Sequence, residues 1–67
     1  MTQQEISNRI RKIEWVLEHD TDLSQNRVMA LAGEWAGLFK SQANNKQWLV
    51  DAVDEGMWAM LHRLRGI

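Results

Sequence analysis

The segment from Val28 to Phe39, VMALAGEWAGLF, constrains the fold of this chain more than any other, because its only charged residue is Glu34. A helix that is apolar on nearly all sides has to be covered by other elements on more than one side. The rest of the sequence places apolar residues at helical spacing, and we expect it to form the helices that cover this segment. The apolar run is about a dozen residues long, which is too short to span a membrane.

The composition predicts a small, purely helical protein that associates with itself. The chain has 67 residues, so we expect residues 1–67 to form a single helical domain. Proline and tyrosine are absent, and there is no cysteine for a disulfide or a thiolate metal site. The apolar surface that so short a chain buries barely offsets the conformational entropy lost on folding. We therefore expect a homodimer, in which association adds buried surface.

Three segments have helical periodicity, at about residues 3–19, 24–40 and 45–65. Thr2 and Glu5 form a capping box at the start of the first segment. Because both connections are short, the pattern predicts either of two arrangements. One is an antiparallel three-helix bundle, and the other is a helical pair that exchanges its third helix with a second copy.

The residues around the connections are suited to ending and starting helices. Asn44 is suited to cap the third segment, and Gly66 is suited to the position just after its end. Three residues are suitable N-caps for the second segment, and the choice among them stays open: Thr21, Asp22 and Ser24.

The predicted core consists of the apolar stripes of the three segments. Its members are Ile6, Ile10, Ile13, Leu17, Val28, Leu31, Ala32, Trp35, Leu38, Phe39, Val50, Val53, Met57, Met60, Leu61 and Leu64.

The far side of the central segment carries a strip of small residues, Ala30, Gly33 and Gly37. Glycine inside a helix lowers its stability by about 1 kcal/mol relative to alanine. A flat strip of this kind lets a second backbone approach closely, so it predicts close helix packing. We favour the interpretation that the first or third helix of the same chain fills it, and the alternative is a helix of a partner.

The sequence predicts neither an enzyme nor a metal or cofactor site. Neither His19 nor His62 stands at a recognisable spacing from a nucleophile. The third segment has an acidic cluster, Asp51, Asp54 and Glu55. These carboxylates interact favourably with the dipole of their helix, so their presence is explained without a substrate. Glu55 and His62 are seven residues apart, which is about 10 Å along a helix and too far to share one ion.

Protein binding is the function that the residues outside the core favour. Four tryptophans in so short a chain are unusual, and tryptophan is a frequent anchor of protein interfaces. Trp15 lies opposite the core stripe of its helix, whereas Trp48 and Trp58 could belong to the core or to an interface. The predicted interface residues are Arg11, Lys12, Trp15, His19, Asp51, Glu55, Trp58 and His62.

We therefore expect a small adaptor, inhibitor or regulator of another protein, of the size that many bacterial and phage genomes encode. The alternative is a nucleic-acid-binding regulator that uses Arg9, Arg11, Lys12 and Trp15 for phosphate contact and base stacking. The net charge of −1 gives no general attraction to nucleic acid or to anionic membranes. The polar start of the chain, MTQQE, differs from a signal peptide, so we expect a cytoplasmic protein.

Overall fold

The computed structural model describes residues 2–42 and 46–66, and these residues fold into three helices without a strand. They are α1 (Gln3–His19), α2 (Gln25–Gln42) and α3 (Gln47–Arg65). The predicted all-α class is confirmed. The bounds of α1 agree with the prediction, whereas α2 extends beyond residue 40 and α3 begins after residue 45. No helix in the described ranges has the length and apolar character needed to cross a bilayer.

Side-chain caps fix where α1 and α2 begin. The hydroxyl of Thr2 accepts a hydrogen bond from the backbone N–H of Glu5 at 3.1 Å, as the capping box predicts. The hydroxyl of Ser24 accepts from the N–H of Arg27 at 3.2 Å, so Ser24 is the residue that caps α2.

The ends of α3 differ from each other in how they are capped. Lys46 occupies the N-cap position without a side-chain hydrogen bond, and the predicted cap Asn44 lies outside the described residues. At the other end Gly66 adopts φ 70°, and its N–H donates to the carbonyl of His62 at 2.9 Å. The left-handed conformation favours glycine, so the predicted role of Gly66 is confirmed.

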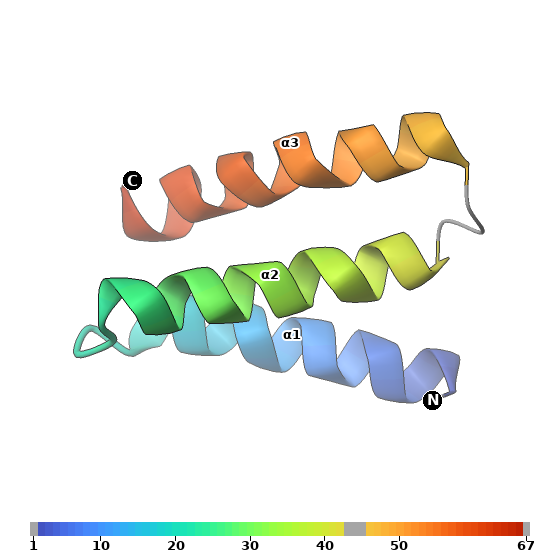
Figure 1. The fold of residues 1–67 in the computed structure, drawn as a ribbon. Coiled ribbons are helices and arrows are strands. Elements are labelled where there is room, and N and C mark those ends of the chain that lie inside the picture. The colour runs from blue at the N-terminus through green and yellow to red at the C-terminus, as the bar shows by residue number, and fades with distance from the viewer. Residues whose placement is uncertain (1, 43–45, 67) are drawn as a thin grey trace.

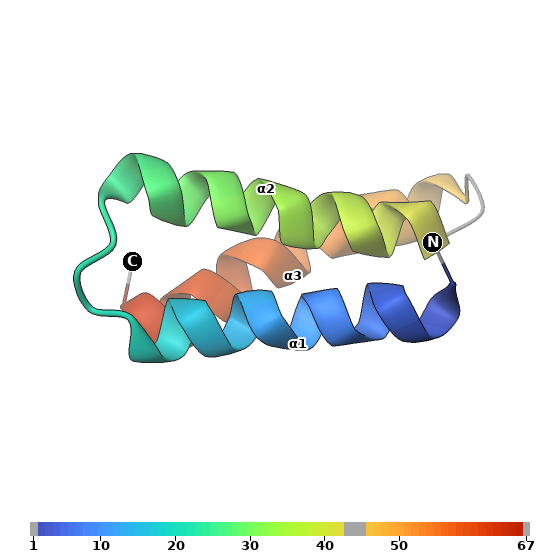
Figure 2. The same cartoon turned by 90° about the horizontal axis from the view of Figure 1, so that it is seen from below.

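The three helices form a triangular bundle. In Figure 1, α2 lies in front, between α3 and α1, and Figure 2 shows α3 behind the gap between the other two. The N-terminus lies at the same end of the molecule as the end of α2, and the C-terminus lies at the opposite end. Each helix therefore has two neighbours and one outward face.

The core sits where the three helices meet, and most of the predicted residues belong to it. Val50 is only half-buried and lies outside the core cluster, which corrects one predicted member. The buried residues are Ile10, Ile13, Leu17, Val28, Leu31, Ala32, Trp35, Ala36, Met60 and Leu61. The half-buried residues packed against them are Ile6, Val16, Leu23, Leu38, Phe39, Val53, Met57 and Leu64.

Trp35 of α2 links the other two helices. Its indole N–H donates to a carboxylate oxygen of Glu14 in α1 at 3.0 Å, so the polar atom of this buried ring has a partner. A Cβ atom at Gly56 in α3 would lie 3.8 Å from the ring, which is an ordinary contact distance. The ring therefore lies directly beside the backbone of α3 at Gly56, with space for a side chain no larger than alanine in between.

Polar contacts close the edges of the bundle. Arg9 of α1 forms a two-pronged ion pair with Glu34 of α2, and Lys40 of α2 pairs with Asp54 of α3 at 2.8 Å. The guanidinium of Arg65 donates to the carbonyl oxygens of Leu17 and Asp20, at 3.1 and 2.7 Å, which satisfies acceptors at the end of α1.

Candidate interaction surfaces

The described residues contain no group of three or more histidine, cysteine, aspartate or glutamate side chains that could hold a metal ion. None of the polar or charged residues described is fully buried. The outward faces of the bundle are distinguished by their exposed large apolar side chains and by the charges around them.

The outward face of α1 presents an ordered aromatic pair. Trp15 is 57% exposed, and its ring stacks on that of His19 with centroids 4.5 Å apart and planes 16° from parallel. The Nδ1 atom of His19 lies 2.9 Å from the carbonyl oxygen of Trp15. A carbonyl can only accept, so Nδ1 carries the proton and the hydrogen bond holds the imidazole against the indole. The predicted outward orientation of Trp15 is confirmed.

A depression of about 350 Å³ lies beside this aromatic pair. Its lining also includes Asp20, Thr21 and Asp22, from the connection between α1 and α2. The carboxylate of Asp20 accepts the backbone N–H of Asp22 at 3.1 Å, which fixes the turn. Sequence reasoning treated this connection only as a source of helix caps, because nothing local shows that it borders an exposed tryptophan.

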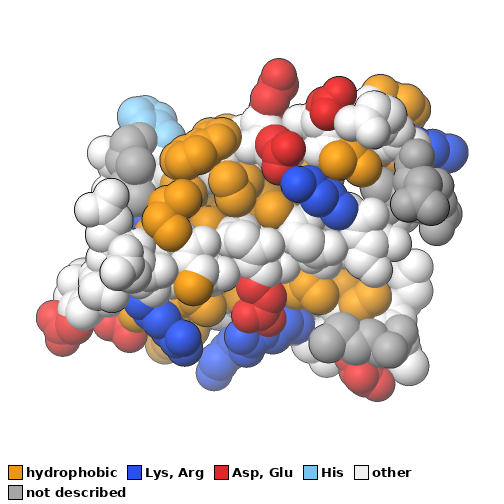
Figure 3. Space-filling model, in the orientation of Figure 1, with side chains coloured by type: hydrophobic (Ala, Val, Ile, Leu, Met, Phe, Trp, Pro, Cys, Tyr) orange, Lys and Arg blue, Asp and Glu red, His pale blue; other side chains and the backbone are white. Residues whose placement is uncertain are grey.

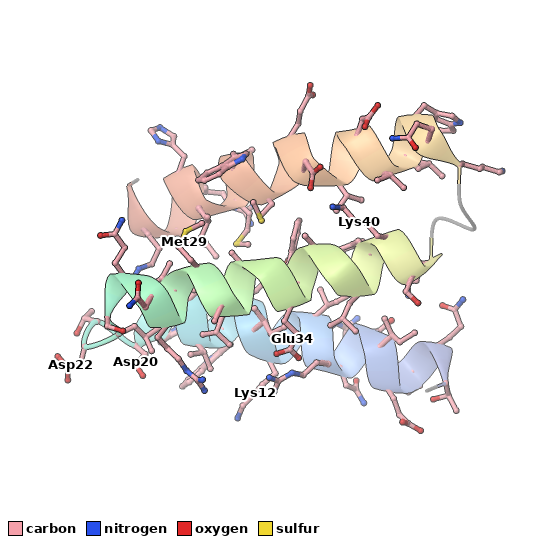
Figure 4. All side chains as sticks on the ribbon, viewed as in Figure 1. Lys12, Asp20, Asp22, Met29, Glu34 and Lys40 are labelled. Atoms are coloured by element: carbon pink, nitrogen blue, oxygen red, sulfur yellow. The ribbon has the colours of Figure 1, made fainter. Side chains whose placement is uncertain are left out.

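Arg11 and Lys12 are exposed on the same helix, before Trp15. Figure 4 shows Lys12 pointing away from α2 and α3, while Asp20 and Asp22 lie beyond the other end of α1. The outward face of α1 therefore has basic residues on one side of Trp15 and acidic residues on the other.

The outward face of α3 brings together the second group of predicted interface residues. Trp58 is 52% exposed, and Asp51, Glu55 and His62 are exposed at helical spacing from it. These four residues lie on a different helix from Arg11, Lys12, Trp15 and His19, so the predicted residues form two separate surfaces.

Met29 enlarges the apolar part of the second surface, and sequence reasoning missed it. It is 37% exposed and lies on α2 at the side near α3 (Figure 4). Figure 3 shows hydrophobic side chains gathered over α3 and along its border with α2. The pattern of α2 gave no signal for Met29, because both its neighbours along the chain are also apolar. Trp48 is 69% exposed near the start of α3.

The small-residue strip of α2 is open. Cβ atoms built on Gly33 and Gly37 would meet no atom of α1 or α3 within 4 Å, and Ala30 is exposed. The favoured interpretation, in which α1 or α3 of the same chain fills the strip, is therefore wrong for the described part of the chain. The reason is geometric. The bulky side of α2 packs against both α1 and α3, so the small-residue strip on the opposite side faces outward.

Glu34 and Arg9 border the strip on its α1 side. The guanidinium of Arg9 hydrogen-bonds to Glu34 and lowers the pKa of that carboxyl below its ordinary value. The same hydrogen bonds raise the pKa of Arg9. The positive charge of Arg9 is thus neutralised at the α1–α2 edge and is directed away from Trp15.

Comparison of the chain with protein-family models, curated proteins and solved structures gives no significant match.

Proposed function

We propose that this chain is a small, non-enzymatic protein-interaction module that binds another protein and also associates with itself. The observation that supports this function is the exposure of large apolar side chains on two outward faces of an otherwise compact bundle. Contiguous exposed apolar surface with a charged rim is the usual anatomy of a protein interface. The antiparallel bundle serves as a scaffold for these two faces, acting in the cytoplasm.

The surface proposed for the partner protein comprises Trp58 and Met29, with Asp51 and Glu55 at its rim. Trp58 offers a large, rigid ring whose burial would contribute more binding free energy than any other residue of this surface. Met29 has a flexible side chain that adapts to the shape of a partner. The acidic rim favours a partner with basic groups around an apolar centre.

The nucleic-acid alternative has less support. It requires Arg9, Arg11, Lys12 and Trp15 to act as one basic and aromatic face, but Arg9 is paired with Glu34. The two remaining cations share the outward face of α1 with Asp20 and Asp22. Such a face gives weak attraction to phosphate.

The self-associating unit is proposed to be the intact bundle. Met60 and Leu61 of α3 are buried in the core of their own chain, which favours this form. A dimer that exchanges α3 between two copies is the other form of the proposal.

Affinity capture with surface variants tests the partner-binding function. Immobilised wild-type protein, Trp58→Ser and Trp48→Ser are exposed to a cell extract of the source organism, and retained proteins are quantified by mass spectrometry. We expect the wild type and Trp48→Ser to retain a common protein. Trp58→Ser should retain at least roughly tenfold less of that protein, as for the loss of an interface anchor. Equal retention by the wild type and both variants would contradict the proposed surface.

A titration with DNA tests the alternative. Duplex and single-stranded oligonucleotides are titrated at increasing salt, and we expect no saturable binding at physiological ionic strength. Tight binding that weakens steeply with salt would replace the protein-binding function, because such a slope reports release of counterions from phosphates.

A further inference from the structure

We propose that the outward face of α1 is a twofold-symmetric contact with a second copy of this chain, in which the two α1 helices run antiparallel. Lys12 of each copy then reaches the carboxylates of Asp20 and Asp22 of the other. This inference rests on the proposed self-association and assigns it to a surface, separate from the one proposed for the partner protein.

The order of charges along α1 identifies a second copy as the occupant. Arg11 and Lys12 precede Trp15, whereas Asp20 and Asp22 follow it. In a twofold contact, residue i of one copy meets residue j of the other, and j meets i. An antiparallel pair centred on this face therefore brings basic residues opposite acidic ones twice, while a parallel pair would align like charges.

The spacing of the residues fits one crossing point. Residue 17 is five positions from both Lys12 and Asp22, and two positions from both Trp15 and His19. Within α1, two residues correspond to roughly 3 Å of helix axis, so a crossing at this level matches the aromatic pair of one copy with that of the other. Lys12 lies roughly 7.5 Å before the crossing, and Asp20 and Asp22 follow it in the turn after the end of α1, so Lys12 of one copy faces the turn of the other.

The depression beside Trp15 gives the incoming lysine a place to bind. Its volume is about 350 Å³, and its lining combines the indole, the imidazole and two aspartates. An ammonium group is attracted both by carboxylates and by the face of an indole ring. Neither aspartate forms an ion pair within residues 2–42 and 46–66. Arg65, which lies near Asp20, donates instead to backbone oxygens.

The aromatic pair is already ordered before association. The stacking of Trp15 on His19 and the hydrogen bond from the imidazole to the Trp15 carbonyl restrict both rings. Side chains that are fixed in advance lose less conformational entropy on binding. A contact made by one helix face belongs to the small class of interfaces, below roughly 1,200 Å², so we expect dissociation in the micromolar range.

Charge reversal tests the arrangement by sedimentation equilibrium of the purified protein from micromolar to millimolar concentration. Lys12→Glu and Asp22→Lys are each expected to raise the dimer Kd roughly tenfold or more, because each places like charges opposite one another twice per dimer. An equimolar mixture of the two variants should recover an affinity near that of the wild type, since the mixed dimer restores both opposite-charge contacts. Lys46→Glu, on the exposed start of α3, is the matched control and should leave the Kd unchanged.

Trp15→Ala provides an independent measurement on the same face. We expect it to raise the dimer Kd roughly tenfold, as for an interface anchor, with an unchanged melting temperature at concentrations where the protein is monomeric. A wild type that stays monomeric to millimolar concentration would overturn the proposal, as would a Kd insensitive to the charge reversals or a mixture that fails to restore association. None of these results bears on the retention of a partner by Trp58, so failure of this contact and failure of the partner-binding function are distinguishable.

Discussion

The two sides of α2 have opposite characters although both consist of apolar residues. The inner side carries Val28, Ala32 and Trp35, which are buried against α1 and α3. The outer side carries Gly33 and Gly37, whose surroundings are open. Glycine lowers helix stability, and a close packing contact, of the kind found on the inner side, is what could compensate for that loss. On the outer side nothing in the described part of the chain compensates, so the fold alone explains only the inner side.

The largest expected effect on stability is that of replacing Trp35, on the inner side of α2. Trp35→Ala is expected to destabilise the protein by about 3–5 kcal/mol, because it leaves a cavity and removes the contact beside Gly56. That loss is comparable to the whole stability of a domain this small, roughly 3–10 kcal/mol, so little folded protein should remain. Circular dichroism during urea titration measures the effect.

Two further variants make the Trp35 result specific. Trp35→Phe keeps an aromatic ring but loses the hydrogen bond to Glu14, and we expect an intermediate loss. Trp58→Ala, on the outward face of α3, should change stability by less than about 0.5 kcal/mol. Similar losses for Trp35→Ala and Trp58→Ala would show that the assignment of inner and outer tryptophans is wrong.

The outer side should respond to substitution in the opposite direction. Gly33→Ala and Gly37→Ala are each expected to stabilise the monomer by about 0.5–1 kcal/mol, because alanine favours the helix and its Cβ meets no neighbour. Thermal unfolding at low protein concentration measures the gain. Gly66→Ala is the matched control and should destabilise, since Gly66 has a positive φ of 70°.

Destabilisation by either substitution in the strip would mean that a backbone lies against Gly33 or Gly37 in solution. The comparison between the two sides would then fail, because both would be packed. A gain in stability, in contrast, would leave the strip as surface whose small residues the monomer does not require.

The sequence predicted the features that depend on neighbouring residues. The bond from the Glu5 amide to the Thr2 hydroxyl, the left-handed Gly66 and the outward orientation of Trp15 all follow from spacing within one turn or one helix face. These features need no knowledge of how the helices cross. The sequence does not determine whether Trp58 is exposed, because the apolar residues of α3 extend over a broad face.

Contacts between helices could not be predicted in the same way. The bonds from Trp35 to Glu14 and from Arg9 to Glu34 join residues 21 and 25 positions apart. Their formation depends on the axial register of α1 against α2, which the periodicity of either helix does not specify. The orientation of the strip was predicted wrongly for a related reason. When a helix is apolar almost all round, its pattern does not identify the third that faces solvent.

The smallest expected effect lies at the boundary between the two sides, where Glu34 pairs with Arg9. Because the pKa of Glu34 is lowered in the folded protein, the charged carboxylate is favoured by folding. The stabilisation is fully present above the ordinary pKa of a glutamate and disappears as the pH falls through the lowered value. Both groups are exposed, so solvent screening keeps the contribution small.

Glu34→Gln should therefore slightly reduce the loss of unfolding free energy between pH 7 and pH 3, the acid limb of the stability profile. Arg9→Gln should have the same effect, and urea unfolding at each pH measures both. Glu55→Gln, at an exposed position in the middle of α3, is the control for loss of one carboxylate. If Glu34→Gln and Arg9→Gln left the acid limb unchanged, the ion pair would contribute nothing to the α1–α2 edge, and the boundary between the two sides would be held by apolar packing alone.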